Sequence, residues 1–154
     1  RSLSLINKNC NSKMPDYGDL TDEDNELLRL AMNLLVEVRG AFEVQAFHVA
    51  LDRIWSVVRA ANIYIDHQAP WVLRREDPDR MQTVLFVLAE VIRRVAILAQ
   101  PVVPAAAGKL LDQLGVTQDA RNFSELNEKI GTKPYIDLPK PVGVFPRFLV
   151  RSDK

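Results

Sequence analysis

Three stretches of the chain repeat apolar residues every three or four positions, and a proline follows two of them. They cover residues 27–42, 47–65 and 81–98. Such a spacing places the apolar side chains on one face of an α-helix. Pro70 and Pro101 end the second and third stretches, because proline lacks an N–H donor and clashes with the preceding turn. The pattern therefore predicts three long helices that turn their apolar faces to a common core.

Local signals at the ends of these stretches agree with helices. Thr21 with Asp24 three residues later matches a capping box, and Asp77 before Pro78 matches an N-cap followed by a proline at the first helical position. Gly115 lies where a C-terminal cap belongs.

Two shorter helices are expected over residues 1–9 and 104–114, which gives about five in total. No stretch alternates polar and apolar residues with the period of a strand, and the connections are short. The sequence thus predicts an all-α fold, an antiparallel helix bundle.

The C-terminal part of the chain differs from the rest. Prolines at positions 134, 139, 141 and 146 disfavour a helix and predict an extended strap. We therefore divide the chain into a helical bundle, residues 1–116, and a C-terminal segment, residues 117–154. This segment is expected to pack back on the bundle or on a neighbouring domain.

The composition limits the classes of protein to which this chain can belong. A chain of 154 residues with 47% hydrophobic residues is the size of one domain with a real core. Its apolar runs are shorter than the roughly 20 residues of a membrane span. The single cysteine, Cys10, excludes a disulfide within the chain and indicates a reducing compartment, so we expect a cytoplasmic protein. A net charge of zero argues against nucleic-acid binding driven by a long-range positive field.

Catalytic patterns are missing from the sequence. His48 and His67 are its two histidines, and no cysteine or carboxylate is arranged around both at metal-ligand spacing. No nucleophile is paired with a base, and no glycine-rich phosphate loop is complete. We expect no catalytic site, no metal site and no cofactor in this chain.

One motif, in contrast, does indicate a function. Residues 60–71 read Ala-Ala-Asn-Ile-Tyr-Ile-Asp-His-Gln-Ala-Pro-Trp, so a helix bearing polar groups ends in a proline and a tryptophan. Asn62, Tyr64, Asp66, Pro70 and Trp71 resemble the Asn-x-Tyr-x-Asp/Glu-x-x-x-Pro-Trp signature of the anticodon-binding bundles of class I aminoacyl-tRNA synthetases. The methionyl branch is the most similar, because residues 1–8, 100–104 and 139–147 resemble its first helix, its helix junction and its closing peptide.

The resemblance implies roles for three residues. The residue matching Trp71 stacks on an anticodon base, the one matching Pro70 shapes the turn, and an arginine matching Arg1 hydrogen-bonds the anticodon. The implied partners are the anticodon stem-loop of tRNA(Met) and the enzyme's own catalytic domain. That domain, outside this chain, would use ATP with magnesium to attach methionine to tRNA, and the protein would be a monomer.

Other residues near the motif have competing interpretations. Two roles are open for Asn62, Tyr64 and Asp66: contact with the anticodon or stabilisation of the bundle. We prefer the second interpretation. Arg74 and Arg75 can follow anticodon-stem phosphates, although Glu76, Asp77 and Asp79 are close enough in sequence to neutralise them. Trp55 falls among apolar residues at helical spacing and is expected in the core. Arg93 and Arg94 are expected on a solvated helix face.

Two other functions compete with this reading. The Pro-Trp motif also fits the equivalent domain of a synthetase for leucine, isoleucine, valine or cysteine. Alternatively, the bundle is a non-catalytic module that binds a partner protein through its basic, proline-rich tail.

Overall fold

The computed structural model describes residues 1–145, and within these the chain forms six α-helices. They are α1 (Ser2–Asn9), α2 (Asp22–Glu43), α3 (Phe47–Gln68), α4 (Pro70–Glu76), α5 (Pro78–Ala99) and α6 (Pro104–Gln113). Two short 3-10 helices follow, η1 (Gln118–Ala120) and η2 (Phe123–Glu125). The described residues contain no strand, and a single isolated bridge pairs Lys13 with Asp137. The predicted all-α bundle is confirmed, and α4 is an additional helix.

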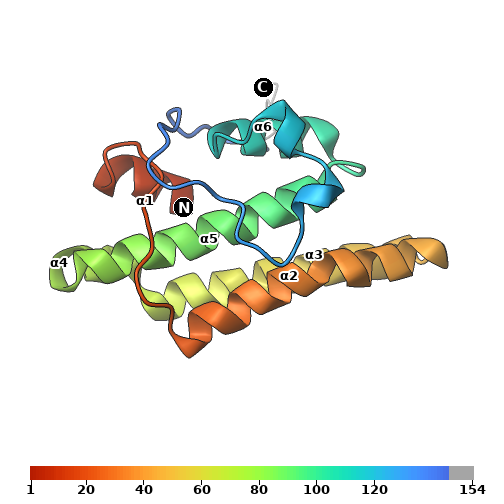
Figure 1. Ribbon diagram of the computed structural model, residues 1–154, viewed down its shortest axis with the longest axis horizontal. Coiled ribbons are helices and arrows are strands. Elements are labelled where there is room, and N and C mark those ends of the chain that lie inside the picture. The colour runs from red at the N-terminus through yellow and green to blue at the C-terminus, as the bar shows by residue number, and fades with distance from the viewer. Residues whose placement is uncertain (146–154) are drawn as a thin grey trace, which may run out of the picture.

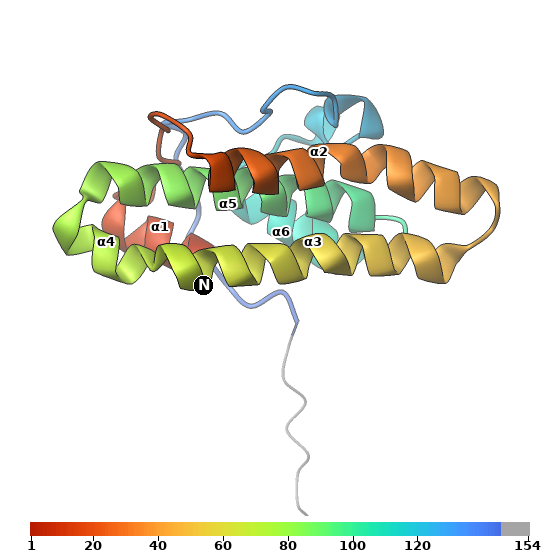
Figure 2. The same cartoon turned by 90° about the horizontal axis from the view of Figure 1, so that it is seen from below.

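Helix α5 is the centre of the bundle. The long helices α2 and α3 run side by side against it, and α1 and α6 lie on its other side (Figures 1 and 2). Successive residues of α5 are apolar, so the helix is hydrophobic nearly all round, which is the pattern of a buried helix. Its side chains at Val84, Leu85, Phe86 and Val87 are fully buried.

The helix ends match the sequence signals. Thr21 and Asp24 form both hydrogen bonds of the capping box at the start of α2. The carboxylate of Asp77 accepts a hydrogen bond from the N–H of Arg80 at 3.0 Å, with Pro78 at the first position of α5. Gly115 follows α6 with a φ of +68°, the left-handed conformation that favours glycine after a helix.

The expectation that Arg93 and Arg94 lie on a solvated face is wrong, because both are buried. The carboxylate of Glu90 accepts hydrogen bonds from Arg93 Nε at 2.9 Å and from Arg94 Nε at 2.7 Å. Spacings of three and four residues usually mark surface pairs. Here the C-terminal segment covers the pairs: the N–H of Thr132 donates to Glu90 at 2.9 Å, and Arg94 Nη2 donates to the carbonyl of Lys129 at 2.6 Å.

The C-terminal segment also contacts the bundle elsewhere. The N–H of Met14 donates to the carbonyl of Ile136 at 2.9 Å. The N–H of Val142 donates to the side chain of Gln113 at 2.8 Å. Residues 131–145 contain no helix, and the prediction for Pro146 falls outside the described residues. No helix in the described part of the chain is long and apolar enough to cross a membrane.

Candidate nucleic-acid interface

The candidate site is built on a joint of one residue between α3 and α4. Ala69 ends α3 and begins α4, with a left-handed backbone at φ +44° and ψ +59°. Its N–H donates to the carbonyl of Ile65 at 3.0 Å, and its carbonyl accepts from the N–H of Val72 at 2.8 Å. Pro70 occupies the first position of α4, where the missing N–H has no intrahelical partner in any case. The end of α3 before Pro70 is confirmed, whereas α4 was not predicted.

A polar network holds the last turns of α3 in place. The hydroxyl of Tyr64 donates to Asp24 Oδ1 at 2.6 Å, and Gln68 Nε2 donates to Glu23 at 2.6 Å. Arg80 on α5 donates to Asp24 Oδ1 at 2.7 Å and to Gln68 Oε1 at 2.6 Å. The network therefore ties the C-terminal end of α3 to the first turns of α2 and α5.

Asp24 is the charged centre of this network. Burial opposes its ionisation, but the hydrogen bonds from Arg80, Tyr64 and the N–H of Thr21 outweigh burial and lower the pKa of the carboxyl. The same surroundings raise the pKa of Tyr64, because burial and the hydrogen bond to Asp24 both disfavour the phenolate. Tyr64 is buried, and its hydroxyl is engaged by Asp24 within the bundle.

Trp71 lies at the surface beside a cation. Its side chain is 42% exposed, and the guanidinium carbon of Arg1 lies 5.5 Å from the centroid of its ring. Arg1 Nη2 also lies 3.2 Å from Asp66 Oδ1. Three elements thus bring Arg1, Asp66 and Trp71 together. An exposed ring with an arginine fork beside it has the chemistry to stack on an unpaired base and to hydrogen-bond its edge.

The other predicted residues surround this group. Asn62 is exposed on α3, four residues before Asp66 and therefore on the same helix face. Arg74 and Arg75 are exposed on α4, three and four residues after Trp71, which places them on its side of the helix. Neither arginine forms an ion pair with any residue of 1–145, so the expected neutralisation by neighbouring acids is not seen there.

The prediction that Trp55 belongs to the core is wrong, because its side chain is 55% exposed. It borders an apolar groove of about 980 Å³ between α3, α5 and α6. A helical apolar stripe predicts a face that packs against something, and it does not tell a core from an open groove. Among residues 1–145, no group of three or more His, Cys, Asp or Glu side chains is placed to hold a metal ion.

Comparisons with known proteins identify the family of the chain. The family model described as the anticodon binding domain of methionyl tRNA ligase matches residues 14–134. A methionine–tRNA ligase of Mesorhizobium japonicum is 46% identical over 149 residues, which are 97% of this chain and 29% of that protein. One of Brucella suis is 47% identical over 157 residues, covering 100% of this chain and 30% of that protein.

The solved structures give the same result. The crystal structure of the apo form of Mycobacterium tuberculosis methionyl-tRNA synthetase matches with a TM-score of 0.92 and 44% identity, and the match covers 97% of this chain and 30% of that protein. The chain thus spans about three tenths of the length of the relatives it matches. It belongs to the methionyl-tRNA synthetase family and corresponds to the anticodon-binding domain of that family.

Proposed function

We propose that this domain recognises the anticodon stem-loop of tRNA(Met). The observation that carries the proposal is the exposed Trp71 ring with the Arg1 guanidinium 5.5 Å from its centroid. Trp71 stacks on an unpaired anticodon base, and Arg1 hydrogen-bonds the edge of a base. Pro70, with Ala69, shapes the turn that presents the ring.

The neighbouring residues have secondary roles in this proposal. Asp66 holds the Arg1 fork by the 3.2 Å ion pair, and Asn62 offers an amide on the same face of α3. Arg74 and Arg75 bind phosphates of the anticodon stem, because a phosphate is the remaining strong partner for two exposed guanidiniums beside the ring. With a net charge of zero, such local contacts replace a long-range field.

The longer protein, in this proposal, attaches methionine to tRNA with ATP and magnesium in a catalytic domain outside this chain. One solved relative is a complex of the Mycobacterium tuberculosis enzyme with methionyl-adenylate, which supports ATP-dependent activation. Residues 1–116 form the tRNA-reading bundle, and residues 117–154 form a C-terminal segment that packs back on the bundle or on the catalytic domain. We place the protein in the cytoplasm, in line with its single cysteine, and expect it to be a monomer.

The decisive experiment measures binding of the domain to an anticodon stem-loop with the sequence CAU and to the same loop with an altered anticodon, across a salt series. Tighter binding of CAU at moderate salt is expected. Equal binding of both loops, with affinity falling alike as salt rises, leaves only phosphate attraction and contradicts the proposal. Competition with tRNAs for leucine, isoleucine, valine and cysteine separates the methionyl function from the related ones.

A further inference from the structure

Helix α4, which carries Trp71, is joined to its neighbours by one residue at each end. Ala69 separates it from α3, and Asp77 both ends α4 and caps α5. Figures 1 and 2 show α4 at the end of the bundle where α3 and α5 meet. A helix of seven residues has little stability of its own. The direction in which α4 presents its side chains therefore depends on how α3 and α5 are held together at this end.

One side chain joins α3 and α5 across the base of α4. Arg80 lies in the first turn of α5, and its Nη2 donates to Gln68 Oε1 at 2.6 Å. Gln68 is the last residue of α3. The two residues are 12 positions apart, and the segment between them is α4 with its two joints. This hydrogen bond therefore closes the loop that carries Trp71.

The guanidinium of Arg80 is itself fixed from the α2 side. Its Nη1 donates to Asp24 Oδ2, and its Nη2 donates to Asp24 Oδ1 at 2.7 Å, so both arms of the fork bind the carboxylate. Asp24 is fully buried, and the Arg80 side chain is 17% exposed. These contacts turn the fork into the protein, in contrast to the exposed Arg74 and Arg75. Arg80 thus acts on other side chains and not on RNA phosphates.

Apolar contacts keep α4 on the bundle but do not set its orientation. Pro70 is buried, and Leu73 packs partly buried against the core. Burial of apolar surface is non-directional. A hydrogen bond, in contrast, requires a particular distance and angle between donor and acceptor. The bond from Arg80 to Gln68 supplies that requirement at the joint.

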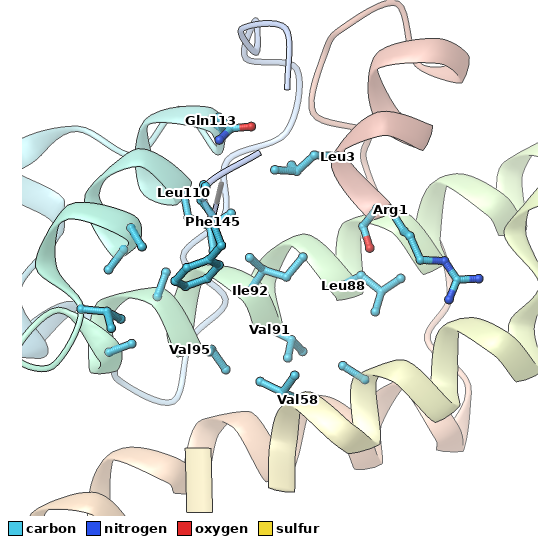
Figure 3. A pocket seen from close by; sticks show the side chains of 18 of the residues that line it. Arg1, Leu3, Val58, Leu88, Val91, Ile92, Val95, Leu110, Gln113 and Phe145 are labelled. Carbon is cyan, nitrogen blue, oxygen red and sulfur yellow. The ribbon is translucent and has the colours of Figure 1, made fainter. Parts of the chain in front are cut away.

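The position of Arg1 depends on the same end of α3. Arg1 Nη2 lies 3.2 Å from Asp66 Oδ1, and Asp66 comes two residues before Gln68. Figure 3 shows the Arg1 guanidinium directed away from Leu110 and Phe145, which line the apolar groove. Fixing the last turn of α3 therefore places the arginine fork as well as the indole ring.

We propose that Arg80 is a positioning residue for anticodon recognition, because it fixes Gln68 and thereby the direction in which α4 presents Trp71. The inference rests on the proposed function, in which the ring stacks on an anticodon base. Stacking requires the ring to lie flat against the base, whereas attraction to phosphates tolerates small shifts. Arg80 therefore contributes to the discrimination between anticodons without touching the RNA.

The test is a double-mutant cycle between Arg80→Lys and Trp71→Ala in the full-length protein, with affinity for the CAU stem-loop as the readout. Lysine keeps the charge beside Asp24 but lacks the planar fork that holds Asp24 and Gln68 together. Arg80→Lys should weaken CAU binding by about fivefold or more, the lower end of the loss of one stacked base. It should weaken binding of an altered loop less. In the Trp71→Ala background the same change should cost less than about twofold, because the ring that Arg80 positions is gone.

Two matched variants separate this effect from a loss of the fold. Gln68→Met removes the acceptor but leaves the pair of Arg80 with Asp24, so it should repeat the cycle even where Arg80→Lys fails to fold. Arg121→Lys is the same substitution at another fork, where Arg121 Nη2 donates to Asp112 at 2.6 Å and the Arg121 side chain is 9% exposed. It should leave the affinity for both loops unchanged.

Hydrogen exchange gives a readout that needs no RNA. The amides of residues 72–77 in α4 should exchange faster in Arg80→Lys and Gln68→Met, because opening of α4 becomes easier when its base is not closed. They should exchange at the original rate in Arg121→Lys. Exchange is followed by mass spectrometry, and circular dichroism checks that every variant is helical.

The outcomes distinguish the positioning role from the proposed function. Equal losses from Arg80→Lys with and without the Trp71 ring would show that Arg80 acts independently of the ring, and would overturn the inference. Affinity that falls in Trp71→Ala but not in Arg80→Lys or Gln68→Met would overturn the inference alone. Unchanged affinity of Trp71→Ala would overturn the proposed function, and the positioning role with it.

Discussion

The guanidinium of Arg1 lies over the ring of Trp71, 5.5 Å from its centroid, although Arg1 caps α1 and Trp71 lies in α4. An arginine over an exposed ring contributes about 0.5–1 kcal/mol. The contact is therefore weak enough for a nucleic-acid base to replace. Arg1 Nη2 also lies 3.2 Å from Asp66 Oδ1, so under the proposed function this ion pair keeps the fork at the site when a base stacks on the ring.

Trp71→Ala should weaken binding of the CAU stem-loop by about 5- to 150-fold, because base stacking on an aromatic ring contributes about 1–3 kcal/mol. Binding is measured by fluorescence anisotropy of a labelled stem-loop. Trp55→Ala is the matched control and should leave affinity unchanged, since Trp55 lies about 20 Å from the end of α3 along the helix rise. An unchanged affinity of Trp71→Ala for the stem-loop would show that the ring does not contact the RNA.

Arg74→Gln and Arg75→Gln test the phosphate contacts. Each change should lower affinity for CAU and altered loops alike and reduce the slope of log affinity against log salt by about one, because one released counterion accompanies each phosphate contact. Arg29→Gln on α2, where Arg29 pairs with Glu26 at 3.6 Å, serves as a control with unchanged slope. A loss confined to the CAU loop would instead assign Arg74 or Arg75 to base recognition.

Ala69→Gly should raise the free energy of unfolding by roughly 0.5–1 kcal/mol, because the left-handed backbone strains alanine more than the flexibility of glycine costs. Urea denaturation measures the change. Ala60→Gly within α3 is the opposite control and should lower stability by about 1 kcal/mol. A destabilised Ala69→Gly would argue against the left-handed joint.

Glu90→Gln should lower the free energy of unfolding by about 3–5 kcal/mol, because it leaves the buried Arg93 and Arg94 without a counter-charge. Chemical denaturation measures the loss. Glu37→Gln, which removes an exposed pair with Arg53 at 3.7 Å, should change stability by about 1 kcal/mol or less. Equal effects of the two substitutions would contradict the buried network.

Acid should destabilise the fold through the same carboxylates. Burial opposes ionisation of Glu90, but Arg93, Thr132 and Arg94 outweigh it and lower its pKa below the ordinary 4.5; the pKa of Asp24 likewise falls below 3.8. A lowered folded-state pKa contributes stability that is complete above the ordinary value and is lost as pH falls through the folded one. Urea titrations from about pH 7 to about pH 3 should show the decline beginning near 4.5, and Glu90→Gln should flatten it.

Much of the fold could be predicted because residues at the helix ends mark where the long helices begin and end. The capping residues Thr21 and Asp77, and Pro70 and Pro101, bound the long helices where the structure has them. The short helix α4 was missed because a proline that ends one helix is also favoured at the start of the next. Only the left-handed Ala69 lets both happen at once, and alanine gives no sequence signal for that conformation.

Burial of side chains was harder to predict than helix position. Arg93 and Arg94 have surface spacing but are covered by a segment more than 30 residues later in the chain. Trp55 has core spacing but faces a groove. The motif predicted Trp71 and Pro70, and in the structure Arg1 lies over the Trp71 ring and pairs with Asp66. Their roles at the anticodon stay predictions.

Ala69 alone separates α3 from α4, so the junction has no further residues that could absorb a change in length. An α-helix advances about 100° per residue, so inserting or deleting one residue between Tyr64 and Trp71 would swing the indole around the axis while the Asp24 network kept α3 fixed. The number of residues across this junction is consequently as constrained as their identity.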